Sequence, residues 1–325
     1  NNIIKITLLL LGALFFSIPS HSLESEWIHS DKSKVRLISS QSASNNNQIL
    51  ILGLEYKLEP GWKTYWKSPG GGGFSQNINW NESTNIKKID IEWPRPKEFE
   101  ILGLTSIGYE DKVIFPLIIT LEDKSEKTYV NINTNYLVCK NICIPGNANL
   151  YLEIPSGKGD FTEHFYNLEK IRSSISLNDL KLSSISNYNI SAEKNKKEVK
   201  LNIKLETEKN FTNPDIFIHT PFGLPVVKPV NDLSLDLKNI QSTFHFDKNQ
   251  FNNDQFIIEV YVYDENHNFE IIESISLEET SISFTDNKSI FAMLLIAKLL
   301  DSVAPEVKII SLVSLLIKSA ISFLA

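Results

Sequence analysis

The chain has 325 residues, which is too long for one ordinary sandwich domain and long enough for two domains. Hydrophobic residues make up 42% and charged residues 22%, so packed cores are expected and wholesale disorder is excluded. The formal net charge of -7, without a basic block, argues against nucleic acid as a partner. With 2 cysteines and 6 scattered histidines, a disulfide-dense scaffold and a four-cysteine zinc site are excluded, and neither a metal nor a cofactor is expected.

Residues 1–22 have the pattern of a signal peptide. Lys5 precedes an apolar run from Ile6 to Ile18, and Ser20 and Ser22 form the small-x-small motif of a signal peptidase site. We expect cleavage after Ser22, with an uncleaved anchor as the alternative. Export would place the mature protein where disulfides persist.

Between residues 23 and 284 the sequence predicts an all-β protein. Short alternating segments, such as 49–54 and 113–119, are rich in β-branched or aromatic residues and are separated by turn residues. An amphipathic helix is expected over 161–175, followed by a polar stretch. This pattern indicates a first β-sandwich at 23–160, a helix and linker at 161–190, and a second β-sandwich at 191–284.

The C-terminal segment 289–325 is again strongly apolar and is expected to be helical. Lys298, Asp301 and Lys318 are among the charges that interrupt it, so neither half is a comfortable membrane span. The stretch 307–325 is the better candidate, and an amphipathic helix at the membrane surface is the alternative. We expect the chain to associate with a membrane through this segment.

A run of four glycines, Gly70 to Gly73, follows a cluster formed by Trp62, Tyr65 and Trp66. No Lys and Ser/Thr pair closes the run, so it does not predict a phosphate-binding loop, and a flexible turn is expected. The aromatic cluster either stacks on a ligand or covers one end of a sandwich core, and covering the core is the commoner role.

The two cysteines, Cys139 and Cys143, lie where one predicted strand ends and the next begins. Facing positions of a hairpin bring side chains close enough for a disulfide. Closing a five-residue loop stabilises a fold by only about 2 kcal/mol, so a purely structural bond would be a weak one. A short accessible disulfide is instead expected to exchange, and Lys140 could favour the thiolate. A structural disulfide and, less well, a metal site remain alternatives.

Four motifs, in this order and spacing, resemble the N-terminal periplasmic region of the DsbD/ScsB thiol:disulfide interchange family. They lie at residues 58–70, 93–96, 103–110 and 136–145. The resemblance covers roughly residues 25–160, and the second β-domain is similar to the longer, ScsB-like members. It implies two immunoglobulin-like sandwiches in the periplasm of a Gram-negative bacterium, tethered to the inner membrane.

The same resemblance implies roles for individual residues. Cys143 would form a mixed disulfide with a partner, and Cys139 would resolve it. A loop would cover the cysteines until a partner docks; we call its residues the cap segment, and they are Glu98, Phe99, Glu100, Ile101 and Leu102. Tyr109 and Tyr136 are expected to shape the site by packing rather than to donate protons.

The resemblance also implies partners, although the chain departs from the family. The partners would be periplasmic thioredoxin-fold proteins of the disulfide isomerase or cytochrome c maturation type. The stretch 301–307 lacks the Pro-Cys pair of the family's first membrane helix, so a separate membrane protein would have to donate electrons. The alternatives are a membrane-tethered adaptor with a structural disulfide, or a truncated relic. A copper- or haem-handling role is suggested only by the family resemblance and is the weakest alternative. The sequence has no methionine cluster to bind copper, because Met293 is the only methionine.

Overall fold

The computed structural model describes residues 22–175, 185–194, 198–220, 228–251, 255–277 and 282–283. The predicted signal peptide, up to residue 21, and the predicted C-terminal apolar helix lie outside these ranges. Among the described residues, no helix combines the length and the apolar character that crossing a membrane requires.

The first half of the chain folds into two antiparallel sheets that face each other. One sheet has the order β1 (Ile28–Ser30), β2 (Ser33–Ser39), β3 (Ile49–Leu58), β9 (Lys112–Leu121) and β6 (Ile86–Ile91). The other has the order β11 (Cys143–Ile154), β10 (Thr128–Cys139), β4 (Lys63–Gly70), β8 (Leu104–Glu110) and β7 (Lys97–Ile101), with β5 (Asn77–Asn79) paired to β10. Tyr56 packs edge-on against Phe115 and Tyr136 in the core between the sheets. The all-β prediction is confirmed for the described chain, and these sheets are consistent with an immunoglobulin-like sandwich.

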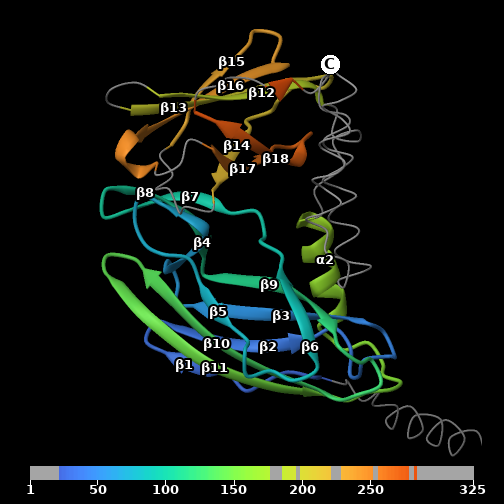
Figure 1. Cartoon of the computed structure of the whole chain (residues 1–325). Coiled ribbons are helices and arrows are strands. Elements are labelled where there is room, and N and C mark those ends of the chain that lie inside the picture. The colour runs from blue at the N-terminus through green and yellow to red at the C-terminus, as the bar shows by residue number, and fades with distance from the viewer. Residues whose placement is uncertain are drawn as a thin grey trace, which may run out of the picture.

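One helix, α2 (Phe165–Ile175), packs on the outer face of the first sheet (Figure 1). It begins four residues later than predicted, because Thr162 caps it: the Thr162 hydroxyl and carbonyl accept the backbone N–H groups of His164 and Phe165. Leu168 is fully buried against Ile38 and Ile114 on the sheet.

The second half also forms two antiparallel sheets. One has the order β15 (Val230–Leu233), β16 (Asn239–Asp247), β13 (Glu198–Thr207), β12 (Ile185–Lys194) and β19 (Ile282–Ser283), and a short 3-10 helix, η1 (Lys248–Gln250), follows β16. The other contains β14 (Asp215–His219), β17 (Gln255–Tyr263) and β18 (Asn268–Ser276). Strand β12 already begins at Ile185, inside the range predicted as linker, so regular structure resumes earlier than the polar composition of that range indicated. We call this half the second sandwich.

The two halves meet along β4, which contacts β14 and, through Lys67, β17. Trp66 is fully buried, and its ring packs against Phe217 and Tyr261. The Lys67 ammonium pairs with the Glu259 carboxylate and lies 2.6 Å from the Tyr261 hydroxyl. Aromatic burial supported by a partly buried ion pair joins the two sandwiches.

His219 lies in this interface, and we expect it to make the stability of the protein depend on pH. Its Nδ1 atom lies 2.7 Å from the Ser68 hydroxyl. Burial, and then the positive charge of Lys67, lower the pKa of His219 below its ordinary value of 6.5, although Glu259 opposes the shift. The folded protein therefore binds fewer protons than the unfolded chain as the pH falls below about 6.5, and the free energy of unfolding decreases there.

We expect His219→Gln to flatten this loss of stability between pH 7 and pH 5.5. Melting temperatures at the two pH values measure it, and His245→Gln, on an exposed histidine, serves as the control. Glu259 contributes little to the change in stability between pH 7 and pH 5.5. Burial raises the pKa of its carboxyl group, but the charge and hydrogen bond of Lys67 outweigh burial, so the pKa is lowered from 4.5. Identical losses in the wild type and in His219→Gln would contradict the prediction.

Candidate redox site

The two cysteines face each other at the tip of the β10–β11 hairpin and form a disulfide. Their Cα atoms are 4.1 Å apart, slightly closer than is usual for directly opposed residues of antiparallel strands. The turn between them is closed by a hydrogen bond of 3.0 Å from the Lys140 N–H to the Ile142 carbonyl. The Lys140 ammonium donates to the Pro60 carbonyl at 3.1 Å, so its charge is engaged away from the sulfur atoms. The hairpin expected from the sequence is therefore present, but the expected assistance from Lys140 is not supported.

The two cysteines differ sharply in exposure. Cys139 has an exposed fraction of 0%, whereas Cys143 is exposed. The sheet order explains the difference: Cys139 on β10 has β11 on one side and β4 on the other, with Lys63 as its partner, while β11 is the edge strand. Solvent and other proteins therefore reach Cys143 first.

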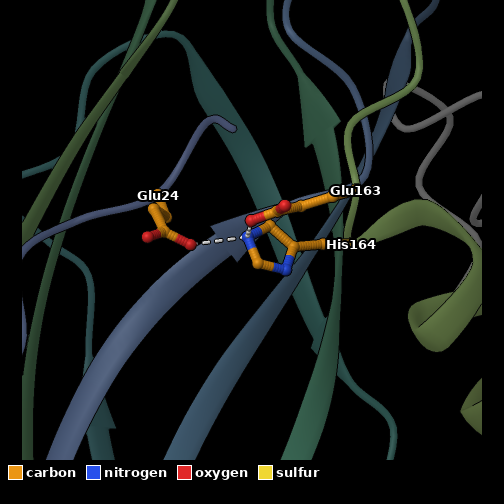
Figure 2. A group of neighbouring side chains, drawn as sticks. All are labelled: Glu24, Glu163 and His164. Carbon is orange, nitrogen blue, oxygen red and sulfur yellow. Dashed lines mark hydrogen bonds and ion pairs between the residues drawn. The ribbon is translucent and has the colours of Figure 1, made fainter. Parts of the chain in front are cut away.

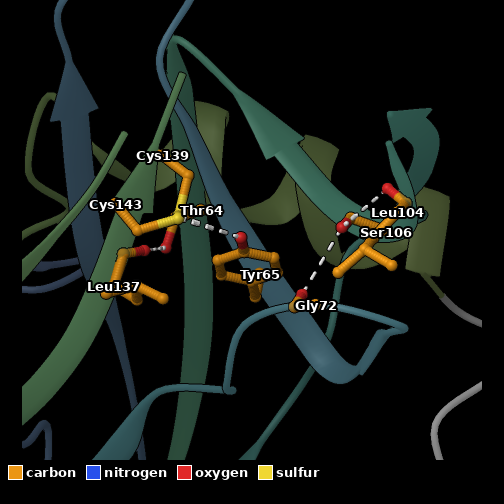
Figure 3. Close-up of a disulfide and its surroundings, with 8 residues drawn as sticks. All are labelled: Thr64, Tyr65, Gly72, Leu104, Ser106, Leu137, Cys139 and Cys143. Carbon is orange, nitrogen blue, oxygen red and sulfur yellow. Dashed lines mark hydrogen bonds between the residues drawn. A yellow bond between two sulfur atoms is a disulfide. The ribbon is translucent and has the colours of Figure 1, made fainter. Parts of the chain in front are cut away.

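Tyr65 is the polar side chain that contacts the buried sulfur. It stands two residues beyond Lys63 on β4, which places it on the same face as Cys139. The Tyr65 hydroxyl donates a hydrogen bond of 3.0 Å to Cys139 Sγ and lies 4.0 Å from Cys143 Sγ (Figure 3). Burial raises the pKa of Tyr65 above 10.0, although a hydrogen bond with Ser106 opposes the shift, so the phenol stays protonated and can donate.

Sequence reasoning placed Tyr65 in an aromatic cluster and missed this contact. The sequence indicates that Lys63 and Tyr65 lie on the same face of a strand. It does not indicate that this face is shared with Cys139, because that depends on the pairing of β4 with β10. The other two aromatic residues have packing roles: Trp62 is buried in the core, and Trp66 is buried where the two sandwiches meet.

The four-glycine run supports the ring of Tyr65. Gly70 ends β4, and the Gly71 N–H donates to the Thr105 carbonyl on β8 at 2.7 Å. Gly73 has φ +98°, and a Cβ atom placed on it would lie 2.2 Å from Tyr65 Cζ. The run was predicted to be a flexible turn. In the structure it turns the chain and also packs closely against the tyrosine at the disulfide.

The cap segment is a strand rather than the predicted loop. Most of it forms β7, which pairs with β8, and Leu102 and Gly103 close the turn between them with φ of 53° and 78°. Strand alternation then divides its residues: Phe99 and Ile101 point inward, whereas Glu98, Glu100 and Leu102 are exposed.

The inward side of the cap segment packs into the cluster that contains the buried sulfur. Ile101, Tyr65, Leu137 and Cys139 form one buried cluster, and Phe99 packs against it. The rings of Phe99 and Tyr65 have centroids 6.4 Å apart. Two of the five predicted cap residues therefore pack in or against the buried cluster that contains Cys139.

Tyr109 and Tyr136 lie away from the disulfide, in the core between the two sheets. The Tyr109 hydroxyl donates to the Pro94 carbonyl at 2.8 Å, and the Tyr136 hydroxyl lies 2.9 Å from the Ser33 hydroxyl. The structure does not bring these two predicted residues together with the cysteines.

Away from the disulfide, a cluster of charged side chains joins the N-terminal segment to the start of α2. His164 Nε2 lies 2.6 Å from a Glu24 carboxylate oxygen and 3.8 Å from Glu163 (Figure 2). These are metal-ligand side chains, but the Arg36 guanidinium also lies 2.7 Å from Glu24 and supplies the positive charge. The group is an ion-pair network that fastens the chain before β1 to the first sandwich.

Comparison with known proteins identifies the first sandwich. The family model described as "Thiol:disulfide interchange protein DsbD, N-terminal" matches residues 34–155. The chain contains a DsbD N-terminal domain. The matched range includes both cysteines, Tyr65 and the cap segment, so the site described above lies wholly inside the DsbD N-terminal domain. No curated protein matches the chain.

A solved structure extends the likeness of fold beyond this domain. The crystal structure of the N-terminal periplasmic domain of ScsB from Proteus mirabilis aligns with a TM-score of 0.63 at 22% identity. The alignment covers 79% of this chain and 99% of the ScsB chain. The arrangement of a DsbD N-terminal domain with further β-structure therefore has a counterpart of the same fold.

Proposed function

We propose that the DsbD N-terminal domain of this chain is a periplasmic dithiol–disulfide relay that reduces oxidised thioredoxin-fold proteins. One observation carries the proposal: Cys143 is exposed at the hairpin tip, whereas Cys139 is buried directly behind it. Thiol–disulfide exchange through a mixed disulfide needs one accessible cysteine and one protected resolving cysteine. The family match supports the reaction class, and the partners and the periplasmic location are inferred from it.

Delivery of electrons begins from the reduced pair. The Cys143 thiolate attacks one sulfur of the partner's disulfide; a Cys143–partner disulfide forms, the partner's own bond breaks, and its other cysteine leaves as a thiolate that takes up a proton. Cys139, after losing its proton, then attacks Cys143 Sγ. The Cys139–Cys143 bond forms, and the partner's second cysteine leaves as a thiolate. In these steps two electrons and one proton pass in total from the domain to the partner.

Recharging runs in the opposite direction. A thiolate of a separate membrane electron donor attacks Cys143 Sγ; a donor–Cys143 disulfide forms, and Cys139 leaves as a thiolate. A second thiolate of the donor then attacks the donor sulfur of that bond, so the donor's own disulfide forms and Cys143 leaves as a thiolate. The Tyr65 hydroxyl, 3.0 Å from Cys139 Sγ, is placed to stabilise the charge on the Cys139 leaving group. Phe99 and Ile101, which pack with the cluster that contains Cys139, exclude water from this sulfur and direct the donor's thiolate to Cys143.

A trapping experiment tests the proposal. The probe is a thioredoxin-fold protein with its resolving cysteine replaced by Ser and its remaining cysteine capped with thionitrobenzoate. Reduced Cys139→Ser should release the chromophore and accumulate a mixed disulfide visible on a non-reducing gel. Cys143→Ser should react at least about 10-fold more slowly, because its remaining thiol is buried. Equal rates for the two variants, or faster reaction of Cys143→Ser, would overturn the assignment.

The burial of Cys139 also favours a second candidate, an adaptor in which the disulfide is structural. This alternative predicts that the disulfide resists dithiothreitol in the native state and that neither single-cysteine variant is trapped. The relay predicts the reverse on both counts.

A further inference from the structure

The cap segment is contacted from outside by the second sandwich. Glu98 Oε1 accepts a hydrogen bond of 2.8 Å from the Lys228 ammonium, which lies two residues before β15. Two residues before β7, Arg95 Nη2 lies 2.9 Å from Asp215 Oδ2 on β14. The Arg95 guanidinium also stands over the Tyr263 ring on β17, 5.3 Å from its centroid. Two ion pairs therefore tie the chain entering the cap segment to the other half of the molecule.

These contacts matter because β7 lies at the edge of its sheet, where a strand is held less firmly. Strand β7 is the last strand of its sheet and pairs with β8 alone. On its inward side Phe99 and Ile101 hold it to the cluster around Cys139. An edge strand held by one ladder can separate locally at a lower free-energy cost than a central strand. The ion pairs to the second sandwich act on this outer, weaker side.

We infer that Arg95 and Lys228 are positioning residues through which the second sandwich keeps the cap segment closed over Cys139. They touch neither sulfur atom. Their pairs with Asp215 and Glu98 hold β7 in place, and β7 in turn holds Phe99 and Ile101 over the buried thiol. The inference rests on the proposed relay, because access to Cys139 has a consequence only if the disulfide is exchanged. It assigns the second sandwich a role in controlling which cysteine reacts.

Losing these ion pairs is expected to increase the opening of the cap segment only moderately, because both pairs are partly exposed. Side-chain exposures are 66% and 36% for Lys228 and Glu98, and 46% and 48% for Arg95 and Asp215. Such pairs shift a local opening equilibrium by about two- to five-fold each, and salt screens them. Losing both should expose Cys139 more often without unfolding either sandwich.

The test measures how fast Cys139 is alkylated when it is the only thiol. In a Cys143→Ser background, iodoacetamide modification is followed by mass spectrometry. Adding Arg95→Ala and Lys228→Ala together should raise the alkylation rate about five- to ten-fold. Lys127→Ala, which breaks the comparable pair of 2.7 Å with Glu153 elsewhere in the first sandwich, is the matched control and should leave the rate unchanged.

Two further measurements separate positioning from general loosening. Exchanging the charges, with Glu98→Lys and Lys228→Glu in one protein, should restore the slow rate that Lys228→Ala alone loses. High salt should accelerate alkylation in the background protein but have little effect on the Arg95→Ala/Lys228→Ala protein. An unchanged rate in that protein, or an equal rise in the Lys127→Ala control, would overturn the inference. Because no partner protein takes part, this outcome is independent of whether Cys143 is trapped by a thioredoxin-fold probe.

Discussion

Tyr65→Phe is expected to slow the reduction of the Cys139–Cys143 disulfide by dithiothreitol about 10-fold. A hydrogen bond to a charged acceptor contributes about 1.5–3 kcal/mol. The effect on the rate lies at the low end of this range, because the thiolate charge is only partly developed in the transition state. The substitution removes the donor that lies 3.0 Å from Cys139 Sγ and keeps the ring beside Phe99. The pKa of Tyr65 is raised by burial, so the wild-type donor is present throughout the neutral pH range.

The rate is measured by acid quenching and alkylation of the freed thiols. Tyr109→Phe is the matched control, because it removes a buried phenol of the same sandwich whose hydroxyl binds the Pro94 carbonyl instead of sulfur. In the Cys143→Ser background, Tyr65→Phe should also raise the pKa of the Cys139 thiol, which the pH dependence of alkylation reports. A reduction rate equal to that of the wild type would show that the phenol has no part in the exchange.

Gly73→Ala is expected to destabilise the first sandwich and to displace Tyr65 from Cys139. A Cβ atom at this position would lie 2.2 Å from Tyr65 Cζ, and the backbone has φ +98°. The unfavourable backbone conformation costs about 1–2 kcal/mol and overpacking adds about 1–3 kcal/mol. Reduction of the disulfide should slow as well, because the displaced phenol no longer reaches the sulfur.

Gly157→Ala separates these two causes. Gly157 has φ +84°, but nothing lies within 4 Å of a Cβ atom placed there. It should therefore show the cost of the backbone conformation alone, with an unchanged reduction rate. Unfolding in denaturant and the reduction rate are measured on both variants. Equal stabilities for the two variants would contradict the predicted contact between residue 73 and the Tyr65 ring.

Local patterns were sufficient for the hairpin that carries the cysteines. The sequence predicted one strand ending near Cys139 and the next beginning near Cys143, and the short interval between the cysteines predicted the turn. The helix was predictable for the same reason, since its apolar spacing is local, and only the Thr162 cap shifted its start. Turns and helices depend on neighbouring residues, which the sequence displays directly.

The environment of the sulfur atoms depends on distant residues and was only partly predictable. Tyr65 reaches Cys139 because β4 pairs with β10, an association across more than seventy positions that no local pattern records. The cap segment was expected from resemblance, but its strand character, and hence the inward direction of Phe99 and Ile101, was not. The contacts of Lys228 and Arg95 with their partners require both sandwiches to be folded.

The position of the disulfide at the very end of its hairpin has a consequence for repeated use. Below the cysteines, the two strands remain paired from Val138↔Ile144 down to Thr128↔Ile154. Opening the sulfur–sulfur bond therefore releases a crosslink at a free end, and every rung of the ladder beneath it stays in register. Such a tip can be opened and closed many times while the rest of the protein keeps its shape, as the proposed relay requires.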